Sequence, residues 1–283
     1  MTRSRRPTIE QVSRWIADGY GQGEGRNYKP FFHVRDVPSS GRSSMVQGLI
    51  TGRTHHYLSD IEYHYHVLIE HFQDVTDIRE QFALLPWGET LEIARALGNR
   101  HPKYPGTKTP IVMTSDLVVS FRRDECPLAV VSVKPAERLK SDRRKFKRTA
   151  EKLLIEMTYW QRRNTPWLLR TEKQLPMNRV ANLDRFRKSM SAPELDHLMC
   201  HFKAFLVAFE KEWEAHMLFG ELLPRLSNRL NLTVDNCHDL LGRAVWAHRL
   251  DIDLDSCVIS EDLPIRRLNA TSPQPFMETD TYA

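Results

Sequence analysis

Two charged side chains stand in apolar segments of the sequence, where an unpaired charge would be costly. Asp116 lies within residues 111–119 (Ile-Val-Met-Thr-Ser-Asp-Leu-Val-Val), and Lys134 directly follows residues 130–133 (Val-Val-Ser-Val). A polar turn, Arg-Arg-Asp-Glu (122–125), separates these Val-rich segments, so they predict a β-hairpin. A hairpin can bring together residues that are 18 positions apart. The pattern therefore predicts that a carboxylate and an ammonium group meet between two neighbouring strands.

A carboxylate and a lysine placed in this way suit the hydrolysis of a phosphodiester. The reaction needs a hard cation such as Mg²⁺, which takes one or two protein carboxylates together with phosphate oxygens and water. Lys134 can stabilise the developing charge, and Glu62 can add a second carboxylate from the preceding helix. Ser132 lies two positions before Lys134 and therefore shares its face of the strand. We therefore expect a metal-dependent phosphodiesterase site.

The helix that carries Glu62 is predicted to begin after Ser59. These two residues form a capping-box pattern, and apolar residues follow at helical spacing: Ile61, Tyr65, Leu68 and Phe72. Other predicted elements are a helix over residues 8–18, strands over 30–34, 77–85 and 167–171, and a long helix over 142–163. The order helix, strands, helix, strand indicates one mixed α/β domain.

After about residue 175 the sequence predicts mainly helices. We expect a long helix over 195–216, shorter helices over 222–230 and 233–248, and two short alternating segments at 250–254 and 258–265. Helices joined by a turn and followed by a β-ribbon describe a winged-helix module. The predicted division is an α/β domain of residues 1–172, a helical, winged-helix-like domain of residues 173–271 and a disordered tail of residues 272–283.

Several segments resemble a known group of nucleases. An acid followed at a distance by a polar residue, any residue and a lysine is the pattern of the restriction-endonuclease-like, or PD-(D/E)xK, nucleases. More specific similarity to the TnsA endonucleases of heteromeric cut-and-paste transposases comes from the segments Gly-Leu-Ile-Thr-Gly-Arg (48–53), His-His-Tyr-Leu-Ser (55–59), Ile-Glu (61–62), Val-Thr-Asp-Ile-Arg-Glu-Gln-Phe (75–82) and Trp-Leu-Leu-Arg-Thr-Glu (167–172). The resemblance covers residues 7–172 well and the remainder loosely. It implies a restriction-endonuclease-like mixed sheet.

The resemblance assigns roles position by position. It implies that Glu62, Asp116 and Lys134 are catalytic, and that Glu62, Asp116 and the carbonyl of Val133 hold the metal. The third motif position is a Gln or an acid in the relatives, and Ser132 departs from that pattern. A hydroxyl is a poorer Mg²⁺ ligand than a carboxylate, so we assign Ser132 a supporting role in the site. The implied cofactor is Mg²⁺, for which Mn²⁺ can substitute.

The implied activity is metal-dependent cutting of one DNA strand at transposon ends during cut-and-paste transposition. The implied partners are the DNA of those ends, a DDE-type transposase subunit that cuts and joins the other strand, and an AAA+ ATPase regulator that contacts the C-terminal domain. Two alternatives stay open. One is another endonuclease of the same fold, such as a restriction enzyme or junction resolvase, and the other is a DNA-binding scaffold with weak catalysis, which Ser132 favours.

A run of cations follows Lys134. Residues 138–148 hold seven Lys and Arg side chains and one acid, so the cations repel one another unless an anion lies nearby. A phosphate backbone would relieve this repulsion, whereas the alternative is a solvated helix face. The residues that we predict to contact DNA are Arg143, Arg144, Lys145, Lys147 and Arg148.

Simpler explanations exist for each residue of the site. Glu62 can be the cap of its helix, Asp116 a buried structural acid and Lys134 a solvated strand end. These three explanations would have to hold together by coincidence, so we favour a common site. The histidine pairs at 55–56 and at 64 and 66 lack the side-chain geometry of a zinc site.

Composition limits the compartment and the class of protein. The chain has 283 residues, a net charge of +5 and 41% hydrophobic residues, which suits a globular protein with an anionic partner. The sequence shows neither a secretory signal nor an apolar run of the roughly 18 residues that cross a bilayer, so we expect a cytoplasmic protein without a membrane partner. Four widely spaced cysteines predict neither a zinc site nor a disulfide framework.

Overall fold

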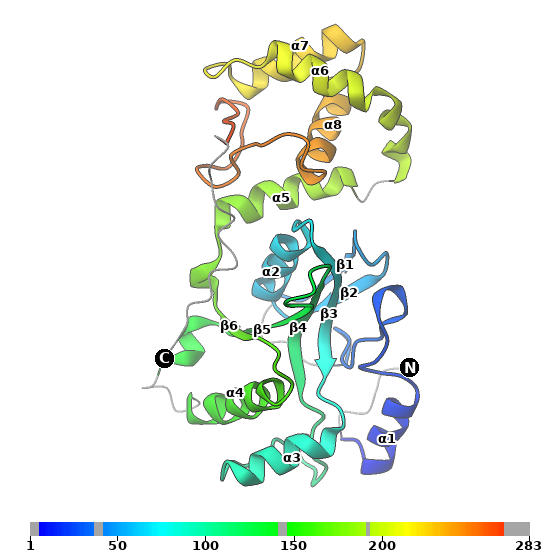
Figure 1. Cartoon of the computed structure of the whole chain (residues 1–283), viewed down its shortest axis with the longest axis vertical. Helices are drawn as coiled ribbons and strands as arrows, with labels where there is room; N and C mark the ends of the chain where they lie inside the picture. Colours follow the sequence, from blue (N-terminus) through cyan, green and yellow to red (C-terminus); the bar gives the residue numbers. More distant parts are fainter. Residues whose placement is uncertain (1–5, 37–41, 141–145, 191–192, 269–283) are drawn as a thin grey trace. The chain divides into compact units, whose positions relative to one another are not determined.

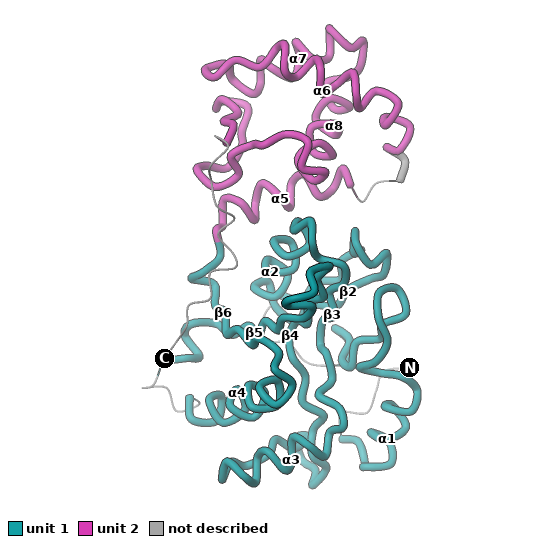
Figure 2. Tube along the Cα trace, viewed as in Figure 1, with its two compact units in different colours: residues 1–175 teal, residues 176–283 magenta. Residues whose placement is uncertain are grey.

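The computed structural model describes residues 6–36, 42–140, 146–190 and 193–268. The chain divides into two compact units, Met1–Leu175 and Pro176–Ala283 (Figures 1 and 2). The division lies close to the domain border that the sequence predicts, whereas the predicted tail at 272–283 lies outside the described residues. In the described part of the chain, we find no helix that combines the length and the apolar character needed to cross a membrane.

A mixed sheet forms the centre of the first unit. Its strands, in spatial order, are β3 (Val75–Ala83), β4 (Thr114–Phe121), β5 (Leu128–Val133) and β6 (Trp167–Arg170). β3, β4 and β5 are antiparallel neighbours, and β6 runs parallel to β5. Parallel neighbours require a crossover, and helix α4 (Phe146–Gln161) lies in this connection. The predicted mixed α/β domain and its central hairpin are thereby confirmed.

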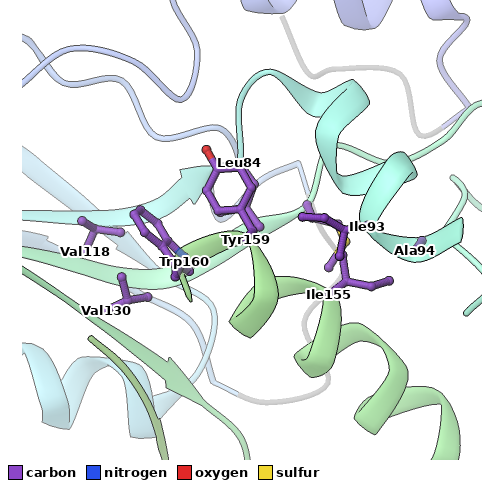
Figure 3. Packing of buried hydrophobic residues seen from close by; sticks show 9 residues of the cluster. Leu84, Ile93, Ala94, Val118, Val130, Ile155, Tyr159 and Trp160 are labelled. Atoms are coloured by element: carbon purple, nitrogen blue, oxygen red, sulfur yellow. The ribbon is translucent and has the colours of Figure 1, made fainter. Parts of the chain in front are cut away.

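The core of the first unit lies between the sheet and two helices. Figure 3 shows Ile155, Tyr159 and Trp160 of α4 packed together with Val118 of β4 and Val130 of β5. Helix α3 (Trp87–Ala96) adds Ile93 and Ala94 to the same cluster. The apolar face of α4 therefore fixes the helix against the hairpin. The predicted helix over 142–163 corresponds to α4, except that residues 142–145 lie outside the described chain.

Two helices of this unit begin where their caps predict. The Thr8 side chain caps α1 (Ile9–Ala17), and the Ser59 hydroxyl caps α2 (Asp60–Glu70) by accepting the Glu62 backbone N–H. Elements that we did not predict are α3 and the hairpin of β1 (Ser44–Gln47) with β2 (Thr54–Tyr57).

The predicted strand at residues 30–34 is wrong, because the chain forms bends and turns there. Phe31 is fully buried, and its N–H donates to the carbonyl of Gln81 at 3.1 Å. The adjacent Phe32 packs against the same core cluster. The apolar residues of this segment thus serve as anchors of a loop, which periodicity alone does not distinguish from a short strand.

The second unit is helical in its described part. Its elements are α5 (Met177–Met190), the 3₁₀ helix η4 (Pro193–His201), α6 (Phe202–Glu212), α7 (Phe219–Leu230) and α8 (Val234–Trp246). Helices α5 and α8 pack closely at Gly242. A Cβ added to this glycine would lie only 2.9 Å from Ser189 Oγ. The two shorter predicted helices correspond to α7 and α8.

Two predictions for the second unit differ from the structure. The single helix over 195–216 is wrong: η4 and α6 replace it, and α6 ends before Trp213, whose indole N–H donates to the Ile265 carbonyl at 2.9 Å. The backbone is extended at Trp213, where α6 ends. The segments predicted as a β-ribbon form isolated bridges, such as Ile252 with Arg267, so the winged helix is not confirmed.

A buried ion pair ties the β1–β2 hairpin to β3. Glu80 is fully buried, and its carboxylate accepts from Arg53 Nη1 at 2.8 Å, Arg53 Nη2 at 2.6 Å and His55 Nδ1 at 2.8 Å. Burial alone would raise the pKa of Glu80, but the hydrogen bonds from Arg53 and His55 outweigh burial and lower it to about 2. Glu80 is therefore ionised and holds the hairpin in place.

Glu80→Gln should destabilise the first unit by about 3 kcal/mol, because it leaves the buried Arg53 without its counter-charge. Hydrogen exchange of the β3 amides, followed during urea unfolding, measures the free energy of unfolding of this unit separately from that of the second unit. The matched control is Glu125→Gln in the exposed turn between β4 and β5. An equal effect of the two substitutions would contradict the structural role of Glu80.

Candidate active site

The β4–β5 hairpin brings together the residues that the sequence places in one site. Leu117 lies opposite Val131, so Asp116 and Ser132 follow at the next position of the ladder. One carboxylate oxygen of Asp116, Oδ2, accepts the Val133 N–H at 2.7 Å and the Lys134 ammonium at 2.7 Å, and lies 3.5 Å from Ser132 Oγ. The hairpin thus gathers Asp116, Ser132, Val133 and Lys134 as predicted from their spacing.

A carboxylate oxygen of Asp116 and the carbonyl oxygen of Val133 both contact the Lys134 ammonium. The Lys134 Nζ atom lies 2.7 Å from Asp116 Oδ2 and 2.7 Å from the carbonyl oxygen of Val133. These are the hairpin atoms predicted to hold a metal ion, and the ammonium shows that both can face a single cation. Burial opposes the charge of Lys134, but Asp116 and then Glu156 outweigh this effect and raise the pKa of Lys134.

Glu62 reaches the same site from the first turn of α2. Its carboxylate is buried and accepts the Leu58 N–H at 3.0 Å and the Ser59 hydroxyl at 2.8 Å. These bonds hold the side chain over the start of its own helix, so its capping contacts also position its charge. Burial and then the negative charge of Asp116 raise the pKa of Glu62 to about 7.

Gln81 on β3 joins Glu62 to the sheet. It lies between the ladder pairs Glu80–Leu117 and Phe82–Ser115 and has a φ of 47°, which is uncommon for a non-glycine residue. Its amide nitrogen donates to Glu62 Oε2 at 3.3 Å. Sequence analysis missed this residue, because an alternating strand pattern does not reveal a single residue with left-handed backbone geometry.

Glu156 is a further buried carboxylate that sequence analysis missed. It accepts the Ser115 hydroxyl at 2.7 Å and the Ser132 hydroxyl at 2.9 Å. Burial and then the charge of Asp116 raise its pKa to about 7. A signal was available: Glu156 lies three positions after Leu153 and four before Trp160, both members of the apolar stripe of α4. An acid on that face has to be buried.

The donor set fits a divalent cation. Asp116 raises the pKa of both Glu62 and Glu156, so the carboxylates repel one another although Lys134 lies among them. A cation near Asp116 would relieve this repulsion. In the described part of the chain, no group of three or more His, Cys, Asp and Glu side chains is arranged as a metal site. Mg²⁺ does not need such a group, because one or two carboxylates with water and phosphate oxygens suffice.

A pocket gives access to this chemistry. It has a volume of about 220 Å³, and Lys134 and Glu156 line it together with Lys152 and Leu153 of α4 and Met113 before β4. Its walls therefore combine the hairpin and the helix that carry the charged groups.

The residues predicted to contact DNA lie only partly within the described chain. Arg143, Arg144 and Lys145 lie outside it, and Lys147 is exposed in the first turn of α4. Arg148 is half-buried, and its guanidinium bonds the Glu151 carboxylate at 2.7 Å and also the carbonyl of Arg100. Arg148 therefore directs hydrogen bonds to groups within the protein.

Part of this chain is similar to known endonucleases. A family model described as "TnsA-like endonuclease N terminal" matches residues 72–172. These residues are similar to the N-terminal part of TnsA-like endonucleases. The transposon Tn7 transposition protein TnsA of Escherichia coli is 41% identical over 165 residues, which cover 58% of this chain and 58% of that protein. The alignment thus spans less than two thirds of the relative's length.

The TnsA-like segment contains most of the site. Asp116, Ser132, Lys134 and Glu156 all lie between residues 72 and 172, whereas Glu62 lies ten residues before the matched segment. Glu62 belongs to the same compact unit and lies close enough to Asp116 for that charge to raise the pKa of Glu62. The structure therefore adds to the matched segment a carboxylate that the match itself does not contain.

The buried Glu156 should make the stability of the first unit depend on pH. Its pKa is raised to about 7, so the folded unit holds this proton more tightly than the unfolded chain. The free energy of unfolding should therefore fall as pH rises from about 5 to 8 in metal-free buffer, and Glu156→Gln should reduce that fall. Urea unfolding at a series of pH values measures the slope.

The matched control for this experiment is Glu92→Gln on an exposed position of α3, which should leave the slope unchanged. The assignment of a buried, ionisable Glu156 would be wrong if the Glu156→Gln variant kept the slope of the unmodified protein.

Proposed function

We propose that this protein is a Mg²⁺-dependent DNA endonuclease that cuts one strand at transposon ends. The observation that carries the proposal is the convergence of Asp116 Oδ2, the Val133 carbonyl oxygen and the Lys134 ammonium within a TnsA-like domain. Glu62 and Glu156 supply further carboxylates beside them. This set contains the acid, carbonyl and lysine that metal-assisted phosphodiester hydrolysis requires.

Each residue takes a defined part in this proposal. Asp116, Glu62 and the Val133 carbonyl would hold Mg²⁺ or Mn²⁺, which supplies charge to polarise the phosphate and to acidify a water molecule. The Lys134 ammonium would stabilise the negative charge that develops on the phosphoryl oxygens. The hairpin fixes the Asp116 and Val133 oxygen atoms before DNA arrives. A metal held by both atoms would require the Lys134 ammonium, which contacts the same two atoms, to move aside.

Ser132 has a supporting part that differs from metal binding. Its hydroxyl donates to Glu156 Oε2 at 2.9 Å and is 3.5 Å from Asp116 Oδ2. Ser132 therefore links the helix acid to the hairpin acid. We infer that Glu156 brings in from α4 the carboxylate that the third motif position of this chain does not provide.

The proposed partners follow from the relative, whose name describes a transposition protein. We propose that the chain works on the DNA of transposon ends, with a DDE-type transposase subunit that cuts the other strand. An AAA+ regulator would contact the second unit. We also propose that the second unit is winged-helix-like. The name of the relative supports a role in transposition, and purified components would test these partners.

Asp116→Asn should abolish Mg²⁺-supported cleavage, because it removes the charge that both the metal and Lys134 need. The fold should persist, since the amide oxygen can still accept the Val133 N–H. A nicking assay on DNA that carries the transposon ends measures activity, and circular dichroism verifies folding. Asp124→Asn in the exposed β4–β5 turn is the control. Retained cleavage in Asp116→Asn would exclude this site.

Lys134→Ala should reduce the cleavage rate far more than Ser132→Ala. The lysine stabilises the transition state, an effect of several kcal/mol, whereas the serine contributes about 1 kcal/mol through one hydrogen bond. The measurement is the cleavage rate against Mg²⁺ concentration for both variants. If Ser132→Ala is as defective as Lys134→Ala, the serine acts directly on the metal or the phosphate.

The same assay separates the alternative functions. Cleavage that requires the transposon ends and the partner transposase supports the proposal. Cleavage of DNA without these ends and without the transposase would favour a restriction enzyme or junction resolvase of the same fold. Binding without any Mg²⁺- or Mn²⁺-dependent cleavage would favour a DNA-binding scaffold.

A further inference from the structure

We propose that a second pocket beside the active site binds the phosphate backbone of the DNA strand that enters it. The pocket lies between the loop at residues 100–107 and α4, and has a volume of about 420 Å³. Arg100, Lys103, Arg148 and Lys152 line it. The inference rests on the proposed nuclease function and extends it, because only Arg148 among these residues was expected to contact DNA.

Three of the four cations that line this pocket have no ion-pair partner in the described part of the chain. Arg148 pairs with Glu151 at 2.7 Å, whereas no ion pair is found for Arg100, Lys103 or Lys152 among the described residues. Partial burial and then the charge of Arg148 lower the pKa of Lys152, which reports the positive potential there. Cations held close together in a concave surface attract an anion.

The walls of the pocket are fixed in place. The Arg148 guanidinium bonds the Arg100 carbonyl, and so joins α4 to the loop. On the loop side, the buried His101 ring bonds the Pro102 carbonyl at 2.9 Å and the Thr90 hydroxyl at 2.9 Å. Arg148 is thus a positioning residue, and Arg100, Lys103 and Lys152 are the groups that can meet a ligand.

The pocket adjoins the active-site pocket. Pro102 and Lys152 line both this pocket and the one that contains Lys134 and Glu156. Arg148, Lys152 and Glu156 are spaced four residues apart and therefore lie along one face of α4. Successive members are separated by about 6 Å along the helix axis.

The shared lining at Lys152 favours, as the occupant, a polyanion that extends from the reacting phosphate. A DNA strand with one phosphate at Lys134 has neighbouring phosphates along its backbone, and the cations of the second pocket are arranged to receive them. A free anion would not require the shared wall at Lys152. We therefore assign the pocket to backbone phosphates flanking the cut site, with contacts that do not depend on base sequence.

The test is a triple variant, Arg100→Gln, Lys103→Gln and Lys152→Gln, in the full-length chain. Its affinity for a short fluorescein-labelled DNA duplex is measured by fluorescence anisotropy in EDTA, over a series of salt concentrations. The slope of log affinity against log salt should be smaller in the variant, by roughly one for each phosphate that the protein no longer binds. Affinity at low salt should fall accordingly.

The matched control is the triple variant Arg14→Gln, Arg95→Gln and Arg122→Gln. These exposed arginines belong to the same unit and line neither pocket, and their removal changes the net charge by the same amount. The control should keep most of the slope of the unmodified protein. Circular dichroism verifies folding of both variants, and Lys152→Gln alone, at an exposed position, replaces the triple variant if that does not fold.

The outcomes separate this inference from the proposed function. If the unmodified protein cuts and binds DNA but the pocket variant keeps its slope, the pocket assignment is wrong and the nuclease proposal stands. If the unmodified protein neither binds nor cuts DNA, both are wrong. Calorimetric binding of inorganic phosphate that depends on these cations, with an unchanged duplex slope, would assign the pocket to a free anion and overturn the proposal.

Discussion

The structure of the site depends on how one partly buried carboxylate is compensated. Asp116 lies in the middle of an apolar strand, and its Oδ2 atom receives the Val133 N–H and the Lys134 ammonium at 2.7 Å each. An uncompensated charge there would cost several kcal/mol, so the register of the hairpin cannot change without losing these donors. The pairing therefore fixes both the strand alignment and the place where charged chemistry can occur.

The surrounding acids are held by hydrogen bonds rather than by salt bridges. Glu62 takes its donors from the start of α2, and Glu156 takes them from the hydroxyls of Ser115 and Ser132. Neutral donors satisfy the oxygen atoms without cancelling the charge. The protein thus keeps negative potential in its interior, which favours cation binding and lowers stability.

The parts of the structure that sequence predicts are those that local patterns encode. The hairpin around Asp116 and the cap at Ser59 follow from short-range spacing, and the family resemblance links them to Glu62. Glu156 and Gln81 were missed because their roles depend on contacts between elements. Glu156 enters the site only when α4 packs on the hairpin, and the conformation of Gln81 has no signature in its neighbours.

Errors in the second unit have a similar cause. Periodicity continues through residues 195–216, yet the chain forms η4 and then α6, which ends before Trp213, whose indole N–H donates to the distant Ile265 carbonyl. The alternating residues 250–265 suit a ribbon, but the structure pairs them only at isolated bridges. A pattern of apolar residues shows which side chains are buried, and tertiary contacts decide the backbone that presents them.

The spacing of charges along α4 constrains how this protein can change during evolution. Arg148, Lys152 and Glu156 share one face of a continuous helix, so their relative directions depend on the number of residues between them. Inserting or deleting one residue there would rotate one end of the helix by about 100° relative to the other. Point substitutions at solvent-facing positions leave that alignment intact. Related sequences that keep the same function should therefore vary in composition across this stretch while conserving its length.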